Sequence, residues 1–334
     1  MKLIIQIPCW NEEDALPLTL ADLPRQIAGV DEVEILVIDD GSIDRTVEVA
    51  QEAGVDHVVR LREHRGLAAA FAAGLDVSLR LGADIIVNTD ADHQYRGRDI
   101  ERLIQPILTG QADMVVGDRQ TDSIPYFSWG KKLLQRIGSW VVRQVSGTHV
   151  PDATSGFRAY SREAALALNV ISDYTYTLET IIQAGAKGIA LAHVPITVNR
   201  PIRKSRLVRS ILDYCCRSAA TILRIYTMYK PLWIFSIFGS VVLMASLALA
   251  IRYLYFLFLG EGTGHIQSVV LAGVLLVLGV QMLLIGLVAD LVSINRCLNE
   301  EVLLRVKKLE LAQAQGTTPQ RSATEEPSAQ ESGG

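Results

Sequence analysis

The sequence predicts an α/β domain built on a mostly parallel sheet, followed by a hairpin of two transmembrane helices. Between residues 1 and 120, short β-rich runs alternate with helical patterns, which is typical of a sheet covered by helices on both faces. Beyond residue 230, two long apolar stretches are joined by a short, Gly-containing connection. The chain therefore divides into a domain of ordinary soluble composition and a membrane anchor.

Composition and charge narrow the class of protein. Hydrophobic residues make up 49% of the chain, above the globular norm, and the excess lies in residues 231–290. The formal net charge of -4 argues against a nucleic-acid-binding protein, which usually carries a basic domain. The first apolar run is too short for a signal peptide, so we expect the N-terminal domain in the cytoplasm. The 4 cysteines show neither metal-ligand spacing nor a disulfide framework.

The individual elements follow from apolar periodicity. Runs rich in Ile, Val and Leu predict strands, and apolar residues three or four positions apart predict helices. The expected strands lie at 3–7, 34–38, 56–60, 84–88, 113–116 and 189–198. The expected helices lie at 13–26, 45–53, 66–81, 99–108, 129–145 and 178–184, and a turn-rich stretch covers 151–158.

The apolar stretches 232–258 and 266–289 each exceed the roughly 20 residues that cross a bilayer core. Arginine and lysine crowd both outer flanks, so by the positive-inside rule the domain and both termini face the cytoplasm, at the inner membrane of the cell. The expected organisation is an α/β domain over 1–205, juxtamembrane amphipathic helices over 206–230, transmembrane helices over 231–292, a cytoplasmic helix over 293–312 and a disordered tail over 313–334.

Asp90-Ala91-Asp92 directly follows an apolar strand, with Gln94 two residues further on. Two carboxylates one residue apart in a loop can both reach one hard cation, and an amide oxygen can complete the set. Mg²⁺ in particular binds through one or two carboxylates together with substrate phosphates. We therefore expect Mg²⁺ or Mn²⁺ at Asp90, Asp92 and Gln94.

Two further polar loops, 8–13 and 39–44, also follow predicted strands. The ligand crevice of an open parallel sheet lies beyond the carboxyl ends of its strands, so these loops and the 89–94 loop form one candidate site. Asp40 is expected to point at a base or ribose. For Ser42 and Asp44, the alternative to a ligand contact is a structural role, in which Asp44 caps the helix that begins at residue 45.

With these motifs in place, the chain resembles family 2 glycosyltransferases of the GT-A fold, and within them the synthases of dolichyl- and polyprenyl-phosphate sugars. The resemblance covers about residues 1–210. The Q-x-x-R-W signature of processive polysaccharide synthases is missing, which argues against chain elongation. The matching pieces are Pro8 to Glu12, Asp39 to Ser42, Asp90 to Asp92, Gly117 to Arg119, Asp152 to Tyr160 and Arg200 to Arg206.

The resemblance implies a role for each matched position. Relatives usually carry lysine where this chain has Arg206, which can clamp a phosphate bidentately. The implied catalytic residues are Asp152, Arg119 and Asp92. Nucleotide-sugar contacts are implied for Pro8, Trp10, Glu12, Ile38, Asp40, Asp90 and Ala91. Acceptor-phosphate contacts are implied for Arg119, Arg200 and Arg206, with Lys131 and Lys132 as further cations.

The resemblance also implies a reaction: transfer of a hexose from a UDP- or GDP-linked nucleotide-sugar to undecaprenyl or dolichyl phosphate at the bilayer surface. A phosphate monoester is largely dianionic near neutral pH, so it needs little deprotonation. We expect catalysis by charge neutralisation and positioning, with the metal stabilising the leaving nucleoside diphosphate. A single displacement inverts the anomeric centre. Asp152 fits either a base or a group that orients the sugar or an arginine.

Two other interpretations stay open from the sequence. A diacylglycerol or lipid-linked saccharide acceptor keeps the fold, but its neutral hydroxyl requires a general base. A membrane scaffold with a degenerate transferase fold is expected to lack the carboxylates, yet Asp40, Asp90 and Asp92 are all present. The sequence names neither the sugar nor the base, and contacts between hairpins could support a homo-oligomer.

Overall fold

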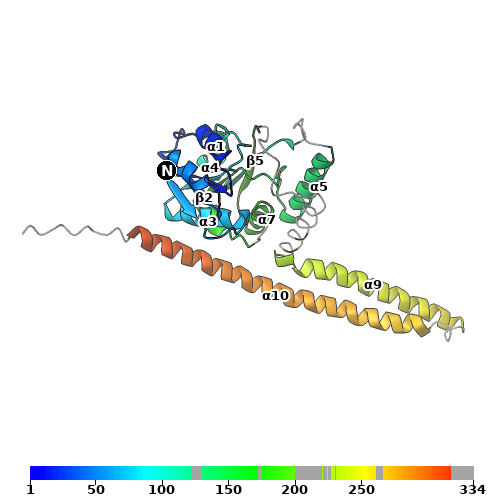
Figure 1. The fold of residues 1–334 in the computed structure, drawn as a ribbon. Helices are drawn as coiled ribbons and strands as arrows, with labels where there is room; N and C mark the ends of the chain where they lie inside the picture. Colours follow the sequence, from blue (N-terminus) through cyan, green and yellow to red (C-terminus); the bar gives the residue numbers. More distant parts are fainter. Residues whose placement is uncertain are drawn as a thin grey trace, which may run out of the picture.

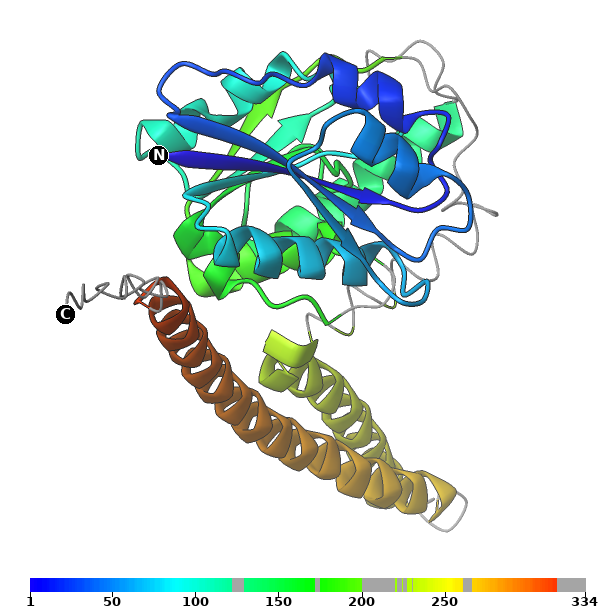
Figure 2. The same cartoon turned by 60° about the vertical axis from the view of Figure 1, so that its left-hand side comes forward.

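The computed structural model describes residues 1–121, 129–171, 175–199, 220, 224, 227–229, 231–260 and 266–316. Within these ranges, a sheet with helices on both faces forms the N-terminal domain, and a long helical hairpin extends away from it (Figures 1 and 2).

The domain is organised around a 7-stranded sheet of order β3-β2-β1-β4-β6-β5-β7. Every pair of neighbouring strands is parallel except those that involve β6, which is antiparallel to both β4 and β5. The predicted mostly parallel sheet is therefore confirmed. The strands are β1 (Lys2–Cys9), β2 (Glu32–Asp39), β3 (His57–Arg60), β4 (Ile85–Asn88), β5 (Met114–Asp118), β6 (Arg158–Ser161) and β7 (Leu191–Pro195).

Helices cover both faces because the sheet is apolar on both. One core cluster joins the sheet to α3, α5, α6 and α7, and the other joins it to α1, α2 and α4. The domain's helices are α1 (Leu16–Asp22), α2 (Thr46–Glu52), α3 (Leu67–Arg80), α4 (Asp99–Leu108), α5 (Trp129–Ser146), α6 (Arg162–Ala167) and α7 (Thr177–Lys187).

Strand β6 is the main difference from the sequence-based prediction, which indicates only a turn over 151–158. The strand has 4 residues, too few for apolar alternation to stand out, and its first residue, Arg158, is a charged one. In the sheet, Arg158 lies opposite Asn88 of β4 and Val116 of β5. Because β6 runs against its neighbours, the loop that precedes it reaches the carboxyl ends of the parallel strands.

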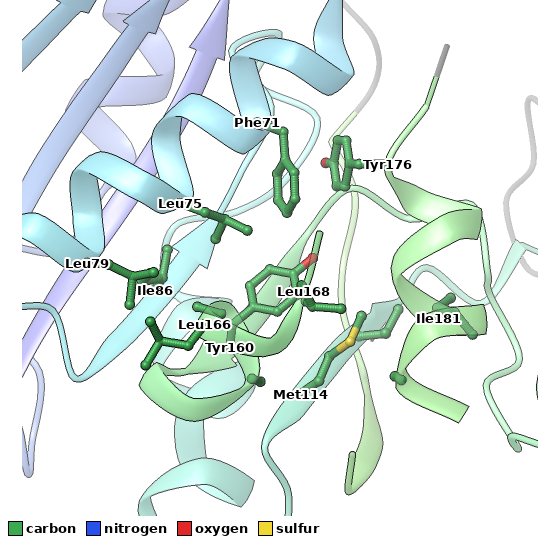
Figure 3. Packing of buried hydrophobic residues seen from close by; sticks show 14 of the residues in the cluster. Phe71, Leu75, Leu79, Ile86, Met114, Tyr160, Leu166, Leu168, Tyr176 and Ile181 are labelled. Carbon is green, nitrogen blue, oxygen red and sulfur yellow. The ribbon is translucent and has the colours of Figure 1, made fainter. Parts of the chain in front are cut away.

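Aromatic packing fixes the start of α7 against α3. The rings of Phe71 and Tyr176 stack at a centroid distance of 3.8 Å and an interplanar angle of 5°, and Tyr160 of β6 packs beside them (Figure 3). All three side chains are fully buried. This cluster brings the segment before α7, which is remote in sequence, to the same edge of the sheet as the β6 loop.

The hairpin consists of α9 (Pro231–Phe258) and α10 (Ile266–Gly316), and both are long and apolar enough to cross a membrane. Only 11% and 17% of their most apolar windows are buried, so neither is the core helix of a soluble protein. Small residues bring the two helices together: Ser246 Oγ donates to the carbonyl of Ala272 at 2.7 Å. An exposed apolar surface of this extent fits a lipid environment.

Helix α10 continues far beyond its apolar span. Its 51 residues reach about 77 Å, more than twice the roughly 30 Å of a hydrocarbon core. The predicted transmembrane segment ending at 292 and the predicted helix from 293 form one unbroken helix. Its polar half contacts the domain, with Lys187 Nζ 2.9 Å from Glu300 Oε2 and Lys307 Nζ donating to Asn169 Oδ1 at 2.9 Å. The hairpin is thus docked on the domain.

Arg158 is a fully buried guanidinium that ties the β6 loop to α7. Its Nε and Nη2 donate to the carbonyls of Ser155 and Ala153 at 2.8 and 2.9 Å. Its Nη1 donates to the carbonyl of Thr177 at 2.8 Å and to Thr180 Oγ1 at 2.6 Å. Four acceptors in two segments therefore share one side chain.

We expect Arg158→Met to destabilise the domain, because the substitution leaves several buried carbonyls without donors, at about 1–3 kcal/mol each. The melting temperature in detergent should fall by roughly 6–12 °C for a loss of about 3 kcal/mol. Arg80→Met is the control, since Arg80 forms only an exposed pair with Asp76. Equal melting temperatures for the two variants would show that the Arg158 contacts do not hold the loop.

Candidate functional site

The loops that follow β1 and β2 are bonded to each other. The backbone N–H of Asn11 donates to Ser42 Oγ at 2.8 Å, and Asn11 Oδ1 accepts from the N–H of Ile43 at 2.9 Å. The N–H of Glu12 donates to Thr46 Oγ1 at 2.8 Å. Asn11 has φ 55, a left-handed conformation that asparagine tolerates. The two predicted nucleotide loops therefore form one rigid surface.

Asp40 is engaged with the segment that leads into α3. Its two carboxylate oxygens accept from the N–H groups of Arg65 and Gly66, both at 2.8 Å, and His64 Nδ1 lies 2.8 Å from Oδ2. The His64 ring stacks on Trp10 at 4.1 Å. Asp40 thus fixes this loop and its aromatic pair, and its predicted contact with a base or ribose stays a prediction.

Pro8 and Ile38 lie side by side at the carboxyl ends of β1 and β2. Both are buried, and Ile38 is 0% exposed, so the backbone is what they offer to a ligand. Glu12 is also buried, and its charge contributes to raising the pKa of Asp90. Of these three predicted nucleotide residues, Glu12 is thus the one whose charge reaches Asp90.

The carboxylate of Asp90 lies against the backbone of Gly156. A Cβ at Gly156 would lie 2.9 Å from both carboxylate oxygens, so any larger residue there requires the Asp90 side chain to shift. Burial, followed by the charge of Asp92, raises the pKa of Asp90 to about 7, against the opposing charges of Arg119 and Arg158. A carboxylate whose ionisation is disfavoured in this way is stabilised by a nearby cation.

Asp92 and Gln94 complete the polar side of this loop. Gln94 donates to Asp92 twice, from its backbone N–H at 3.2 Å and from Nε2 at 3.1 Å, which leaves Gln94 Oε1 as an acceptor. Ala91 is buried, and its carbonyl accepts from Thr19 Oγ1 at 2.9 Å. The described part of the chain holds no cage of three or more His, Cys, Asp or Glu side chains. Two carboxylates and an amide oxygen fit a cation whose remaining ligands include a substrate phosphate.

Arg119, directly after β5, forms a bidentate pair with Asp152. Its Nε donates to Oδ2 at 2.7 Å and its Nη2 to Oδ1 at 2.9 Å, and Nη2 also donates to Thr154 Oγ1 at 2.6 Å. Burial alone would raise the pKa of Asp152, but the charge and hydrogen bonds of Arg119 lower it. Burial likewise opposes the charge of Arg119, and Asp152 more than offsets this, so the pKa of Arg119 is raised. Both groups are therefore charged at neutral pH.

Several residues that hold the site were not predicted. Asn88 Nδ2 donates to the carbonyl of Gly156 at 2.9 Å and to Tyr176 Oη at 2.8 Å, while the N–H of Gly156 donates to Tyr95 Oη at 3.1 Å. A buried asparagine that ends an apolar strand is a signal that could have been used. The sequence carries no comparable signal for Tyr95 and Tyr176, because their role depends on the antiparallel insertion of β6.

Four predicted phosphate-binding residues cannot be assigned contacts. Lys131 and Lys132 lie in the first turn of α5, but their side chains are outside the described part of the structure. Arg200 and Arg206 lie outside the described residues altogether. Arg119 is the predicted phosphate ligand whose side chain is described, and it lies near enough to Asp90 for its charge to lower the pKa of that carboxyl.

With this geometry established, comparison with known proteins decides the family. Residues 4–168 match the model described as Glycosyl transferase family 2. An undecaprenyl-phosphate mannosyltransferase of Micrococcus luteus is 30% identical over 223 residues, which cover 64% of this chain and 90% of that protein. The chain belongs to glycosyl transferase family 2. This family 2 enzyme is a glycosyltransferase, as its motifs predict.

Other relatives extend the similarity along the chain. Polyprenol monophosphomannose synthase of Mycolicibacterium smegmatis is 30% identical over 207 residues, 59% of this chain and 77% of that one. Glycosyltransferase AglJ of Haloferax volcanii is 29% identical over 317 residues, which cover 92% of this chain and 97% of AglJ. The similarity to AglJ thus includes the region of the hairpin.

The predicted GT-A fold is confirmed by solved structures. Glucosyl-3-phosphoglycerate synthase from Mycobacterium tuberculosis, crystallised with Mn²⁺, UDP-glucose and phosphoglyceric acid, aligns with a TM-score of 0.53. The alignment covers 68% of this chain and 78% of that one at 22% identity. At this identity the likeness establishes the fold of the family 2 domain.

The ion pair at the site predicts a pH-dependent stability difference between the wild type and Asp152→Asn. Because the folded-state pKa of Asp152 lies below its ordinary value of 3.8, the pair's contribution is full above that value and is lost as the pH falls through the folded pKa. At pH 7 the variant should lose about 3–5 kcal/mol, because Arg119 becomes an unpaired buried charge. The difference in melting temperature should be largest near pH 7 and should shrink as the pH is lowered below 3.8 toward the folded pKa of Asp152; a gap that stays constant down to acid unfolding contradicts the pair.

Proposed function

We propose that this enzyme transfers a hexose from a nucleotide-sugar to a polyprenyl phosphate at a membrane surface. The observation that carries the proposal is that the Arg119 guanidinium lies near enough to the Asp90 carboxyl for its charge to lower the pKa of that group, in a chain with an exposed apolar hairpin. One part of the site suits the diphosphate of a donor through a cation, and the other suits a second phosphate. The hairpin suits an acceptor that cannot leave the bilayer.

The names of the relatives support this acceptor. An undecaprenyl-phosphate mannosyltransferase and a polyprenol monophosphomannose synthase are each 30% identical to this chain. A Methanococcus voltae relative, 28% identical, is named for transferring N-acetylglucosamine from UDP to dolichyl phosphate. Two of the three names specify mannose and one N-acetylglucosamine, and all three specify a polyprenyl-type phosphate or polyprenol.

The chain's own residues then have defined tasks. Arg119 holds the acceptor phosphate, and Asp152 and Thr154 fix the guanidinium by three hydrogen bonds. Asp152 is a poor base, because its pKa is lowered and both its oxygens accept from Arg119. A dianionic phosphate needs no base, so an orienting aspartate suffices. Attack by the phosphate oxygen from the side opposite the leaving group inverts the anomeric centre.

Asp90, Asp92 and Gln94 would hold Mg²⁺ or Mn²⁺, which when bound supplies charge stabilisation for the leaving nucleoside diphosphate. Gly156 leaves room for both oxygens of Asp90 at this position. The loop pair 8–13 and 39–44 orients the nucleoside.

The basic flanks of the hairpin support a position of the domain on the cytoplasmic face of the membrane. In this arrangement α10 holds the domain at the bilayer surface, because Glu300 and Lys307 of α10 contact the domain. The carboxyl edge of the sheet then needs only to face the head-group region for a lipid phosphate to enter.

The test is transfer of radiolabel to an organic-extractable product. The full-length protein, reconstituted in nanodiscs with undecaprenyl phosphate and Mn²⁺, should glycosylate the lipid phosphate from at least one hexose in a UDP- and GDP-sugar panel. Asp92→Asn should lower turnover at least 100-fold, because it removes a cation ligand beside the diphosphate. Asp76→Asn, which alters an exposed helical pair, should leave turnover unchanged.

Two outcomes contradict the proposal. Labelling of diacylglycerol in place of the polyprenyl phosphate would make the acceptor a hydroxyl and require a general base. Absence of any lipid product, with normal turnover of a nucleotide-sugar onto a soluble acceptor, would retain a family 2 glycosyltransferase and remove the lipid acceptor.

A further inference from the structure

A cavity of about 560 Å³ lies at the junction of the hairpin and the domain. Its described walls come from the residues just before α9 and from α10 where its apolar span ends, and they include Arg224, Met228, Ala289, Val292 and Arg296. At this junction α9 begins beside the domain and α10 passes it (Figures 1 and 2).

The cavity is apolar toward the membrane span and cationic toward the domain. Ala289 and Val292 lie at the end of the apolar stretch of α10, and Arg296 is one turn further toward the domain. Arg224 lines the same space and is exposed. An apolar wall beneath two guanidinium groups matches an amphiphile that carries a negative head group.

The polar end of the cavity has more donors than acceptors. Arg296 Nε donates to Glu300 Oε1 at 2.9 Å, but Glu300 is shared with Lys187, whose Nζ lies 2.9 Å from Oε2. The Arg296 guanidinium lies over the ring of Tyr229 at 5.3 Å. Arg296 Nη1 and the Tyr229 hydroxyl are buried without a hydrogen-bond acceptor among the residues described. Arg296 and Lys187 therefore share the carboxylate of Glu300 at this end of the cavity, and Arg224 adds a further positive charge.

We propose that this cavity binds one anionic phospholipid, with its phosphate between Arg224 and Arg296 and its acyl chains along Val292 and Ala289. The phospholipid is not the sugar acceptor, because neither the carboxylates of Asp90 and Asp92 nor Arg119 line the cavity. The bound lipid anchors the domain-proximal end of the hairpin at the head-group level. The proposal rests on the hairpin crossing a membrane and does not depend on which acceptor the enzyme uses.

Native mass spectrometry of the detergent-solubilised full chain tests the site with phosphatidylglycerol and phosphatidylcholine as probes. We expect one phosphatidylglycerol to bind at least tenfold more tightly than phosphatidylcholine. Arg224→Gln should weaken this binding about fivefold or more, and the double variant with Arg296→Gln should abolish the preference. Arg305→Gln is the control, since Arg305 lies on the same helix but pairs with exposed Glu301.

Arg224→Gln carries the test, because this exposed residue can change without disturbing the Arg296–Glu300 contact. Equal affinity for the two lipids, or an unchanged preference in Arg224→Gln, overturns the proposal. Competition by millimolar inorganic phosphate would show that the site takes a free anion. Displacement by equimolar undecaprenyl phosphate, with a raised KM for that lipid in Arg224→Gln, would assign the cavity to the acceptor. A preference for phosphatidylglycerol that persists in the presence of both competitors supports the phospholipid site.

Discussion

The close approach of Gly156 to the carboxylate of Asp90 is the constraint on which the rest of the site depends. It requires the loop before β6 to lie flat against the end of β4, and Asn88, Tyr95 and Tyr176 hold the backbone of Gly156 there. The same loop carries Asp152, which fixes Arg119. One short antiparallel strand therefore brings the carboxylates and the guanidinium of the site together.

The membrane anchor is connected to this constraint through α7. The helix begins next to Tyr176, which stacks on Phe71 and contacts Asn88, and it ends at Lys187, which pairs with Glu300 of α10. Helix α10 is unbroken from the apolar span to this contact. A rigid element thus links the depth of the bilayer to the position of the site, which suits a reaction between a soluble donor and a partner confined to the membrane.

The parallel part of the fold was predictable because its strands contain runs of Ile, Val or Leu that alternate with helical patterns along the chain. Asp90, Asp92 and Asp40 could therefore be placed at one edge from spacing alone. The insertion of β6 could not be predicted in this way. Its 4 residues begin with a charged one, and its partners, Asn88 and Val116, lie far away in sequence. For the same reason the sequence left Asp152 open between base and orienting group, and its contacts with Arg119 favour the second role.

The most direct test of this account is calorimetric titration of Mn²⁺ into the full-length protein in the presence of UDP or GDP. The account predicts saturable binding by the wild type that Asp92→Asn abolishes and Gly156→Ala weakens at least tenfold, because the added Cβ displaces Asp90. Gly138→Ala is the matched control, as no described atom outside the local helix backbone lies within 4 Å of a Cβ at that position. Wild-type affinity in Gly156→Ala, or Mn²⁺ binding that persists in Asp92→Asn, would contradict a cation site built on these two carboxylates.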